Sequence, residues 1–195
     1  MNLKLQYKLV YKIKNSRDPR LKSFSEEYII NRISKFKKTR TVLNYEDVKL
    51  INDKVPGTYL IYSLTNGKLA FCYVGESTNV FERFKQHING FRNGKDRLYS
   101  KMRKKVKELE DISFMVLDEI EDQNERLKKE TYYIYTMKSK FFSLNSKLVN
   151  RRLRCPSGHG MVRSFMTYDK EAEKLNLIVY GRCVNKHCNI TFVIK

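Results

Sequence analysis

GTYLIYSLTNGKLAFCYVG, the stretch from residue 57 to residue 75, decides how the centre of this chain folds. Residues 58–64 and 69–74 are mainly apolar, aromatic or β-branched, and Thr65-Asn66-Gly67-Lys68 separates them. Asn-Gly between two such runs is a strong hairpin signal, because both residues tolerate the positive φ angles of the tightest turns. The stretch therefore predicts two antiparallel strands, with Tyr59 and Tyr73 roughly opposite each other on the two arms.

The segments around this hairpin show helical and strand patterns in turn. We expect helices over residues 25–38, 78–88, 98–109 and 122–137, and a third strand over residues 112–117. Ser77 or Thr78 is expected to cap the second helix, and residues 89–96 to form a loop. Near the start of the chain, alternating residues 3–13 predict a further strand. The pattern is that of a mixed α/β protein.

Composition narrows the partners. Among 195 residues, 40 are Lys or Arg and 21 are Asp or Glu, which gives a formal net charge of +19. A surface this positive attracts polyanions. Nucleic acid is therefore the first expected partner and an anionic membrane surface the second. The alternative is a basic protein whose charge serves solubility alone. No apolar run reaches the roughly 18 residues of a membrane span, and the N-terminal residues do not resemble a signal peptide. We therefore expect a cytoplasmic protein without a membrane partner.

Shifts in composition divide the chain into three parts. Residues 1–54 form a basic N-terminal extension, residues 55–149 contain the hairpin and most predicted elements, and residues 150–195 contain three of the four cysteines. In a cytoplasmic protein, clustered cysteines favour metal binding over disulfide formation.

The middle part contains polar residues where a core is expected. Arg83 and His87 share one face of a predicted helix, beside its apolar stripe, and Glu130 points with the buried stripe of the last helix. Each of these features has an ordinary structural explanation when taken alone. Arg83 and His87 would be a pair at the solvent edge of the helix, and Glu130 would form a salt bridge with a nearby arginine. Tyr59 and Tyr73 would be an ordinary cross-strand aromatic pair. Taken together they suit phosphodiester hydrolysis: Glu130 can hold a divalent cation, the cation and Arg83 can stabilise charge on phosphorus, and a tyrosine can activate water if the metal or Arg83 lowers its pKa.

An ordered set of these residues resembles the GIY-YIG nuclease domain over about residues 56–147. It comprises Gly57-Thr58-Tyr59, Tyr73-Val74-Gly75, Ser77, Arg83, His87, Glu130 and Asn145. The resemblance implies a small α/β domain, with a three-stranded antiparallel sheet flanked by helices, that cleaves DNA with a metal.

The same resemblance implies roles for single residues. Tyr59 is the leading candidate for water activation, and Tyr73 supports it or takes that role. Arg83 binds the scissile phosphate, and His87 assists through hydrogen bonds. Glu130 binds Mg²⁺ or Mn²⁺, and Asn145 fixes the last loop of the site.

Two basic segments are candidates for contact with DNA phosphates. The predicted helix at 98–109 has too many cations for one face, and the linker at 150–154 is equally basic. The residues expected to bind DNA are Lys101, Arg103, Lys104, Lys105, Arg151 and Arg152. A solvated helix is the plain alternative.

The last part of the chain has the ligand spacing of a zinc site. Cys155 and His159 precede Cys183 and Cys188 by a spacer that is long enough for a β-hairpin. Two ligand pairs so arranged suit tetrahedral zinc, and a tail of this size needs such a metal to fold. These four residues are the preferred ligands, and His187 is the alternative to His159 as the fourth ligand. The remaining alternative is that the cysteines bind no metal and are free thiols.

This tail also resembles a known family. Cys155-Pro156, Arg163-Ser164, Tyr180, the Cys183–Cys188 segment and Thr191-Phe192 are similar to the Ogr/Delta zinc fingers of phage transcription activators. The resemblance implies contact with DNA or protein and a phage or mobile-element origin.

The sequence thus predicts a modular DNA endonuclease with Mg²⁺ or Mn²⁺ at Glu130 and a structural Zn²⁺. Two alternatives remain: a zinc-finger DNA-binding regulator whose nuclease domain is inactive, and a nuclease for structured or RNA substrates. Both a monomer and a homodimer stay open.

Overall fold

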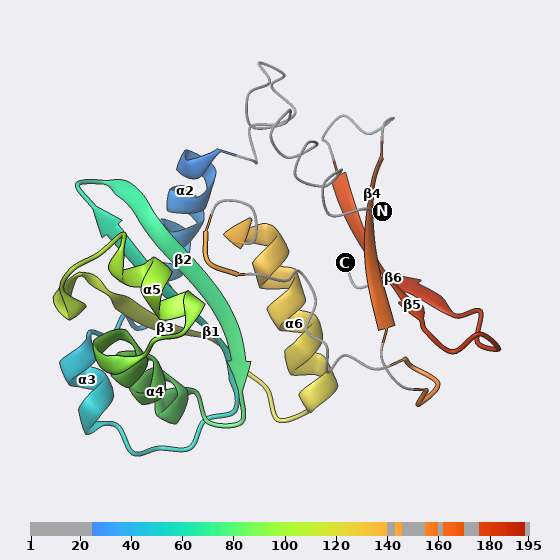
Figure 1. Ribbon diagram of the computed structural model, residues 1–195, viewed down its shortest axis with the longest axis horizontal. Coiled ribbons are helices and arrows are strands. Elements are labelled where there is room, and N and C mark those ends of the chain that lie inside the picture. Colours follow the sequence, from blue (N-terminus) through green and yellow to red (C-terminus); the bar gives the residue numbers. More distant parts are fainter. Residues whose placement is uncertain (1–24, 140–142, 146–154, 160–161, 170–175, 194–195) are drawn as a thin grey trace.

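The predicted hairpin is the centre of the observed fold (Figure 1). The computed structural model describes residues 25–139, 143–145, 155–159, 162–169 and 176–193. Its elements, in chain order, are α2 (Glu26–Lys37), α3 (Tyr45–Leu50), β1 (Gly57–Thr65), β2 (Lys68–Ser77), α4 (Val80–Asn93), α5 (Arg97–Arg103), the 3₁₀ turn η2 (Leu109–Asp111), β3 (Ser113–Glu119), α6 (Gln123–Thr136), β4 (Val162–Asp169), β5 (Asn176–Cys183) and β6 (Thr191–Val193).

β1, β2 and β3 form one antiparallel sheet in the order β2-β1-β3. The turn between β1 and β2 has Asn66 at φ 50° and Gly67 at φ 72°, as the Asn-Gly pair predicts. With helices on both sides of this sheet, the predicted mixed α/β fold with a flanked three-stranded antiparallel sheet is confirmed.

A β-bulge in the hairpin decides which face each β2 side chain occupies. Leu64 pairs with Leu69, but Ser63 pairs with Phe71, so Ala70 is an extra residue in β2. Side chains alternate along a strand, and one extra residue moves everything beyond it to the other face. Without this bulge, Tyr73 would lie on the face opposite Tyr59.

Helices cover both faces of the sheet and create two cores. α2 and α6 pack on one face, where Ile29 and Ile33 of α2 are fully buried. α3, α4 and α5 pack on the other face, with Phe84 of α4 fully buried (Figure 1). Each strand therefore has an apolar neighbour on both sides, which holds the sheet rigidly.

Two predicted helix boundaries are wrong. α4 begins after Asn79, whose side chain caps it in place of Ser77 or Thr78, and it continues through Gly90 to Asn93 instead of ending before a loop. The basic helix α5 ends at Arg103, because Val106 and Leu109 turn back into the core beside α4.

The proposed boundary at residue 55 divides segments that share a core. α2 contributes to the core beneath α6, and Leu43 forms an isolated bridge with Phe114 of β3. The strand predicted at residues 3–13 lies outside the described residues. Among the helices described, none combines the length and the apolar character that crossing a bilayer requires.

The C-terminal part is a second small sheet. β4, β5 and β6 are antiparallel in this order. Val162 of β4 contacts both the cysteine cluster and the core beneath α6, and Phe192 packs against that same core. The two parts of the molecule therefore meet on the α6 side of the large sheet.

Candidate active site and metal centre

Tyr59 and Tyr73 share one face of the hairpin and form a cross-strand aromatic pair, as predicted. Because of the bulge, Tyr59 pairs with Gly75 and Tyr73 pairs with Ile61, so the two tyrosines are diagonal neighbours with ring centroids 6.4 Å apart. A Cβ atom on Gly75 would lie 2.3 Å from Cζ of Tyr59. Glycine is therefore required at this position for the Tyr59 ring to lie across β2.

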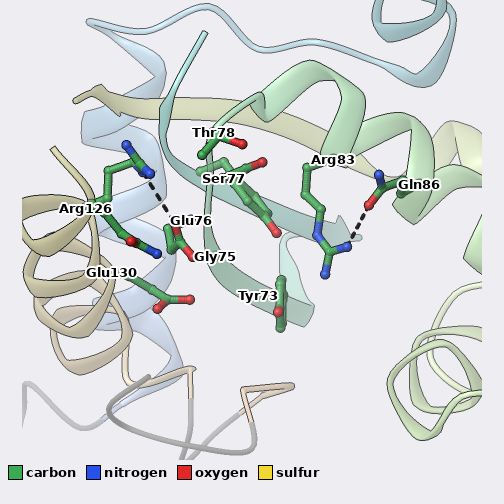
Figure 2. A pocket seen from close by; sticks show the side chains of 11 residues that line it. Tyr73, Gly75, Glu76, Ser77, Thr78, Arg83, Gln86, Arg126 and Glu130 are labelled. Carbon is green, nitrogen blue, oxygen red and sulfur yellow. Dashed lines mark hydrogen bonds and ion pairs between the residues drawn. The ribbon is translucent and has the colours of Figure 1, made fainter. Parts of the chain in front are cut away.

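A polar cavity of about 310 Å³ opens beside these tyrosines. Arg83 on α4 and Glu130 on α6 approach it from opposite sides, with Tyr73 between them (Figure 2). Sequence elements that are distant along the chain thus meet at one site, as expected. The lining residues are Tyr59, Tyr73, Gly75, Glu76, Ser77, Thr78, Arg83, Gln86, Gln123, Arg126 and Glu130.

His87 lies behind the cavity wall and not at a solvent edge. Its side chain is 1% exposed, and Nε2 is 2.9 Å from the hydroxyl oxygen of Tyr59. On the other side of the ring, Nδ1 is 3.3 Å from the hydroxyl oxygen of Tyr99. Burial and the charge of Arg83 lower the pKa of His87 to about 3, so the imidazole is neutral at physiological pH.

The protein groups around the two phenols do not by themselves lower the pKa of either one, so the expected lowering would have to come from the metal. Burial, and then the neighbouring Tyr73, hold the pKa of Tyr59 well above its usual value, although Arg83 acts in the opposite direction. Burial, and then the charge of Glu130, raise the pKa of Tyr73 to about 12. Both tyrosines are therefore neutral phenols that donate and accept hydrogen bonds.

Glu130 and Arg126 lie one turn apart on α6 and both face the cavity (Figure 2). Glu130 is 7% exposed. Arg126 is 3% exposed, and its Nε lies 3.3 Å from Oε2 of Glu76 on β2. A carboxylate this well buried beside a polar cavity fits a hard divalent cation, which prefers oxygen ligands.

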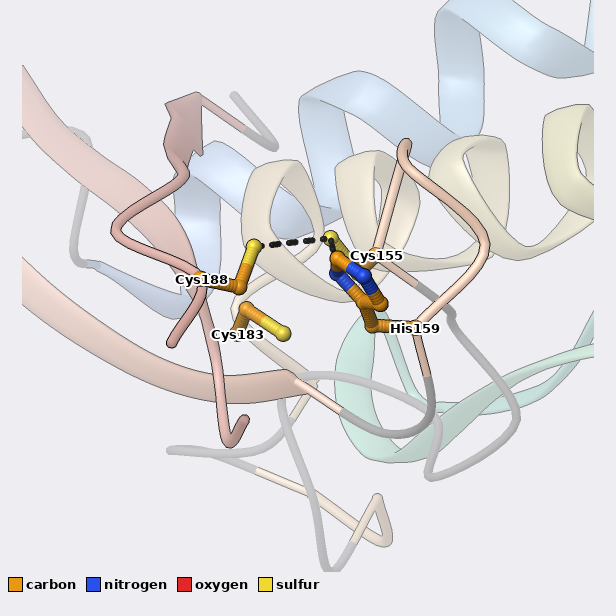
Figure 3. A group of neighbouring side chains, drawn as sticks. All are labelled: Cys155, His159, Cys183 and Cys188. Atoms are coloured by element: carbon orange, nitrogen blue, oxygen red, sulfur yellow. Dashed lines mark hydrogen bonds between the residues drawn. The ribbon is translucent and has the colours of Figure 1, made fainter. Parts of the chain in front are cut away.

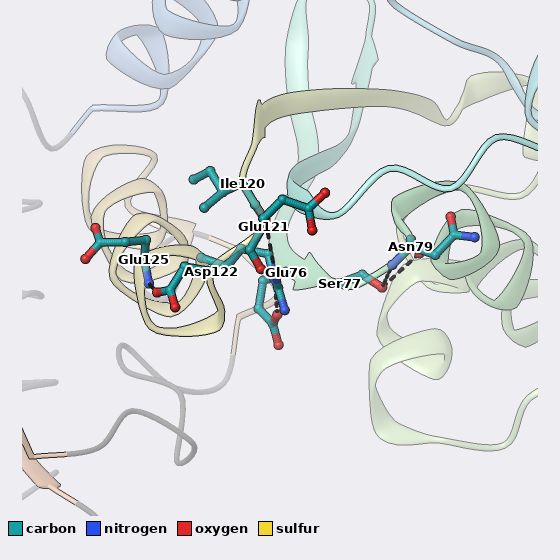
Figure 4. Close-up of polar contacts among 8 residues, drawn as sticks. Glu76, Ser77, Asn79, Ile120, Glu121, Asp122 and Glu125 are labelled. Carbon is teal, nitrogen blue, oxygen red and sulfur yellow. Dashed lines mark hydrogen bonds and ion pairs between the residues drawn. The ribbon is translucent and has the colours of Figure 1, made fainter. Parts of the chain in front are cut away.

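The loop before α6, which contains Ile120, Glu121 and Asp122 (Figure 4), holds Arg126 in place. Nη1 of Arg126 donates to the carbonyl oxygens of Ile120, at 3.1 Å, and of Glu121. Asp122 caps α6 by accepting from the backbone N–H of Glu125. These contacts fix the first turn of α6 and, through the helix, the position of Glu130.

Asn145 binds the backbone of β2 next to Tyr73. Its Oδ1 accepts from the N–H of Val74 at 2.9 Å, and its Nδ2 donates to the carbonyl oxygen of the same residue at 2.7 Å. An amide that satisfies both backbone groups of one residue ties the chain after α6 to the strand that holds the site.

The predicted DNA-binding residues differ in their surroundings. Lys101, Lys104 and Lys105 are exposed. The guanidinium of Arg103 instead donates to the carbonyl oxygens of Gly90, Phe91 and Gly94 at the end of α4, so its hydrogen bonds are used within the domain. Residues 151 and 152 lie outside the described residues.

Four predicted zinc ligands come together at the C-terminal sheet (Figure 3). The ligand atoms of Cys155, His159, Cys183 and Cys188 all lie within 4.8 Å of one another. Sγ of Cys155 is 3.8 Å from Sγ of Cys188, and tetrahedral zinc with Zn–S bonds of about 2.3 Å separates two sulfurs by about 3.8 Å. This donor set fits Zn²⁺, whereas the alternative ligand His187 is exposed and outside the cluster.

Short turns present these ligands. Gly158 has φ +74° and donates to the carbonyl oxygen of Cys155, and the N–H of Asn185 donates to Sγ of Cys183 at 3.4 Å. Burial opposes ionisation of Cys155, but hydrogen bonds from Ser157 and Cys188 hold its pKa below the usual range. Hydrogen bonds of this kind stabilise a thiolate that binds a metal.

Sequence reasoning missed several residues of the site. Arg126 is detectable in principle, because it lies four residues before Glu130 on the same helix face. Glu76 and Tyr99 have no local signal, since each is recruited by a partner distant in sequence.

Comparison with known proteins agrees with this geometry. Residues 55–145, just under half of the chain, match the GIY-YIG catalytic domain, in line with the resemblance found in the sequence. A GIY-YIG domain implies a nuclease of the endonuclease superfamily. No curated protein and no solved structure gave a significant match to the chain.

Proposed function

We propose that this chain, whose residues 55–145 match the GIY-YIG catalytic domain, is a metal-dependent DNA endonuclease. The observation on which the proposal rests is the cavity that gathers Tyr59, Tyr73, Arg83 and Glu130 from four different elements. In this proposal the domain at 55–149 cuts, the module at 150–195 binds DNA with the help of zinc, and residues 1–54 add binding surface. The similarity of the tail to Ogr/Delta fingers supports a phage or mobile-element origin.

Each lining residue has a proposed task. Glu130 would hold Mg²⁺ or Mn²⁺, which supplies positive charge next to the scissile phosphate when bound. The guanidinium of Arg83 binds the phosphate oxygens and stabilises their negative charge during cleavage. Gln86 accepts from Nη1 of Arg83 at 2.7 Å and so orients that guanidinium towards the cavity.

The neutral phenols would orient the attacking water through hydrogen bonds. The oxygen of Tyr59 accepts a hydrogen bond from the attacking water while its own hydrogen is directed at His87. Tyr73 supports this arrangement or replaces Tyr59 in it. Comparison of Tyr59→Phe with Tyr73→Phe separates the two assignments, because the variant that loses the water acceptor shows the larger loss in kcat.

Exposed cations in α5 and just after it supply general affinity for DNA in this proposal. Lys101, Lys104 and Lys105 are on one side of the domain that bears Arg83, and phosphate contacts from such residues are lost steeply with salt. Replacing all three by Ala should flatten the dependence of DNA affinity on salt while leaving kcat at saturating DNA unchanged.

The decisive experiment is plasmid cleavage by the full chain. Intact protein should cut with Mg²⁺ or Mn²⁺ and be inactive with EDTA, and Glu130→Gln should lower the rate about 10³-fold or more, because the metal ligand is lost. Glu125→Gln, an exposed position on the same helix, is the matched control and should cut normally.

Two outcomes would replace this proposal. If the intact protein binds DNA but leaves it uncut with every divalent metal tried, the protein is a zinc-module DNA-binding regulator. If branched DNA or RNA is cut and duplex DNA is not, the substrate assignment is wrong while the nuclease assignment stands.

A further inference from the structure

Three side chains form a hydrogen-bonded row that leads away from the cavity. The Tyr59 hydroxyl is 2.9 Å from Nε2 of His87, and Nδ1 of His87 is 3.3 Å from the hydroxyl of Tyr99. Tyr59 lines the cavity, whereas His87 and Tyr99 lie behind it. The last member of this row is therefore not among the residues that line the cavity, but it is connected to the site through His87.

The donors of the row can be assigned from the chemistry of its members. A neutral imidazole has one N–H, so His87 donates to one tyrosine and accepts from the other. The positively charged guanidinium of Arg83 lines the same cavity as Tyr59, and its charge acts on the Tyr59 hydroxyl. A cation on that side favours the orientation in which the Tyr59 O–H points away from Arg83 and donates to Nε2. The single N–H of His87 is then on Nδ1 and points at Tyr99.

Two glycines make room for Tyr99 in this row. A Cβ atom on Gly90 would lie 2.2 Å from Cζ of Tyr99, and one on Gly94 would lie 2.8 Å from Cδ2 of the same ring. Gly90 is in the interior of α4, where glycine lowers helix stability by roughly 0.5–1 kcal/mol relative to alanine. The absence of a side chain there lets the Tyr99 ring cross the helix and reach His87.

We propose that Tyr99 is a positioning residue which accepts a hydrogen bond from Nδ1–H of His87 and thereby keeps Nε2 as the acceptor for Tyr59. In that tautomer the Tyr59 hydrogen points away from the cavity, and the Tyr59 oxygen presents a lone pair to water. In the other tautomer Nε2–H would donate to Tyr59, whose hydrogen would turn towards the cavity. The effect on cleavage rests on the proposed function, whereas the tautomer itself does not.

The test is the tautomer of His87 in Tyr99→Phe, which keeps the ring and removes only the hydroxyl. ¹⁵N shifts of the labelled imidazole, one of three in the chain, should report the Nδ1–H form in the intact protein and a mixture in the variant. We expect kcat to fall about 10- to 100-fold, with KM for DNA unchanged. Tyr28→Phe, on the opposite face of the sheet, should change neither quantity.

A second variant tests the same idea with the hydroxyl retained. Gly90→Ala places a methyl group where the Tyr99 ring lies and should produce the same mixture of tautomers. This variant provides the test if Tyr99→Phe folds poorly. An Nε2–H imidazole in the intact protein, or an unchanged tautomer in both variants, would overturn the proposal. If no protein cleaves any substrate but the tautomer changes as expected, the endonuclease proposal fails and the positioning role stands.

Discussion

The cavity beside β2 and the cysteine cluster beside β5 hold their functional groups by different means. Around the cavity, the side chains come from a sheet and from helices that pack on it, with an apolar core on each face of the sheet. At the cluster, the apolar group identified among the described residues consists of three thiols with Val162 and Ile190 packed against them. The first region is ordered by burial and strand pairing, whereas the second needs a metal to supply comparable free energy. The difference predicts how each region responds when one contact is removed.

The largest expected effect is the loss of the zinc ligands. Cys188→Ser should remove zinc and unfold β4–β6, because structural zinc contributes about 10–16 kcal/mol in small metal-dependent modules. The amide signals of β1–β3 should persist, because their cores need no metal. Zinc content and amide spectra of the full chain measure both effects.

The histidines supply the control for this prediction. His187→Ala removes an exposed side chain outside the cluster and should retain zinc, whereas His159→Ala should behave like Cys188→Ser. Zinc loss in His187→Ala alone would show that the fourth ligand is wrongly assigned.

The next effect concerns the buried ion pair between Arg126 and Glu76, whose side chains are 3% and 5% exposed. Arg126→Met should lower the free energy of unfolding by about 3–5 kcal/mol, because it removes the cation that lies against the buried carboxylate of Glu76. Urea denaturation measures the loss. The double variant Arg126→Met with Glu76→Gln should recover part of it.

An exposed pair on the same helix serves as the comparison. Lys128 and Glu125 are about half exposed, so Lys128→Met should change stability little. Equal losses in Lys128→Met and Arg126→Met would contradict the view that burial makes the Arg126 pair important.

A smaller effect follows from the pH dependence of His87. Its pKa falls from 6.5 to about 3 on folding, so the unfolded chain binds the proton first as the pH decreases. Stability from this group is fully present above pH 6.5 and is lost between pH 6.5 and 3. Between pH 7 and pH 5, the intact protein should lose about 2 kcal/mol more than His87→Gln. Urea unfolding at both pH values, followed at β1 and β2, tests this; equal losses would mean that His87 is not buried as a neutral group.

Sequence alone predicted the parts of each region that depend on local pattern. The Asn66-Gly67 turn specified the hairpin, the helical position of Glu130 placed it inward, and cysteine spacing gave the four clustered ligands. In each case a short stretch of chain already contains the determining information: a required φ, a helical period, or a ligand spacing.

The features of the fold and the site that the sequence did not predict depend on contacts between distant segments of the chain. No local signal marks Ala70 as the extra residue that brings Tyr73 to the face of Tyr59. In the sequence, Gly90 indicates the end of a helix because glycine has a low helix propensity. In the structure, α4 continues through Gly90, and Tyr99 packs across the helix at this position. A lowered tyrosine pKa was expected only if the metal or Arg83 caused it, and the depth of burial of Tyr59, which raises the pKa, is not visible in sequence.

The smallest expected effect separates two glycines of the same hairpin. Gly67 has φ +72° and open space around it, so Gly67→Ala should cost only about 1–2 kcal/mol of stability from backbone strain. Cleavage should be unchanged, because the bulge and the two cores still fix the register that places Tyr59. Gly75→Ala is the contrast: there the methyl group meets the Tyr59 ring, so cleavage should fall. If Gly67→Ala abolished cleavage of plasmid DNA while the protein stayed folded, the turn and not the packed sheet would determine the geometry of the site.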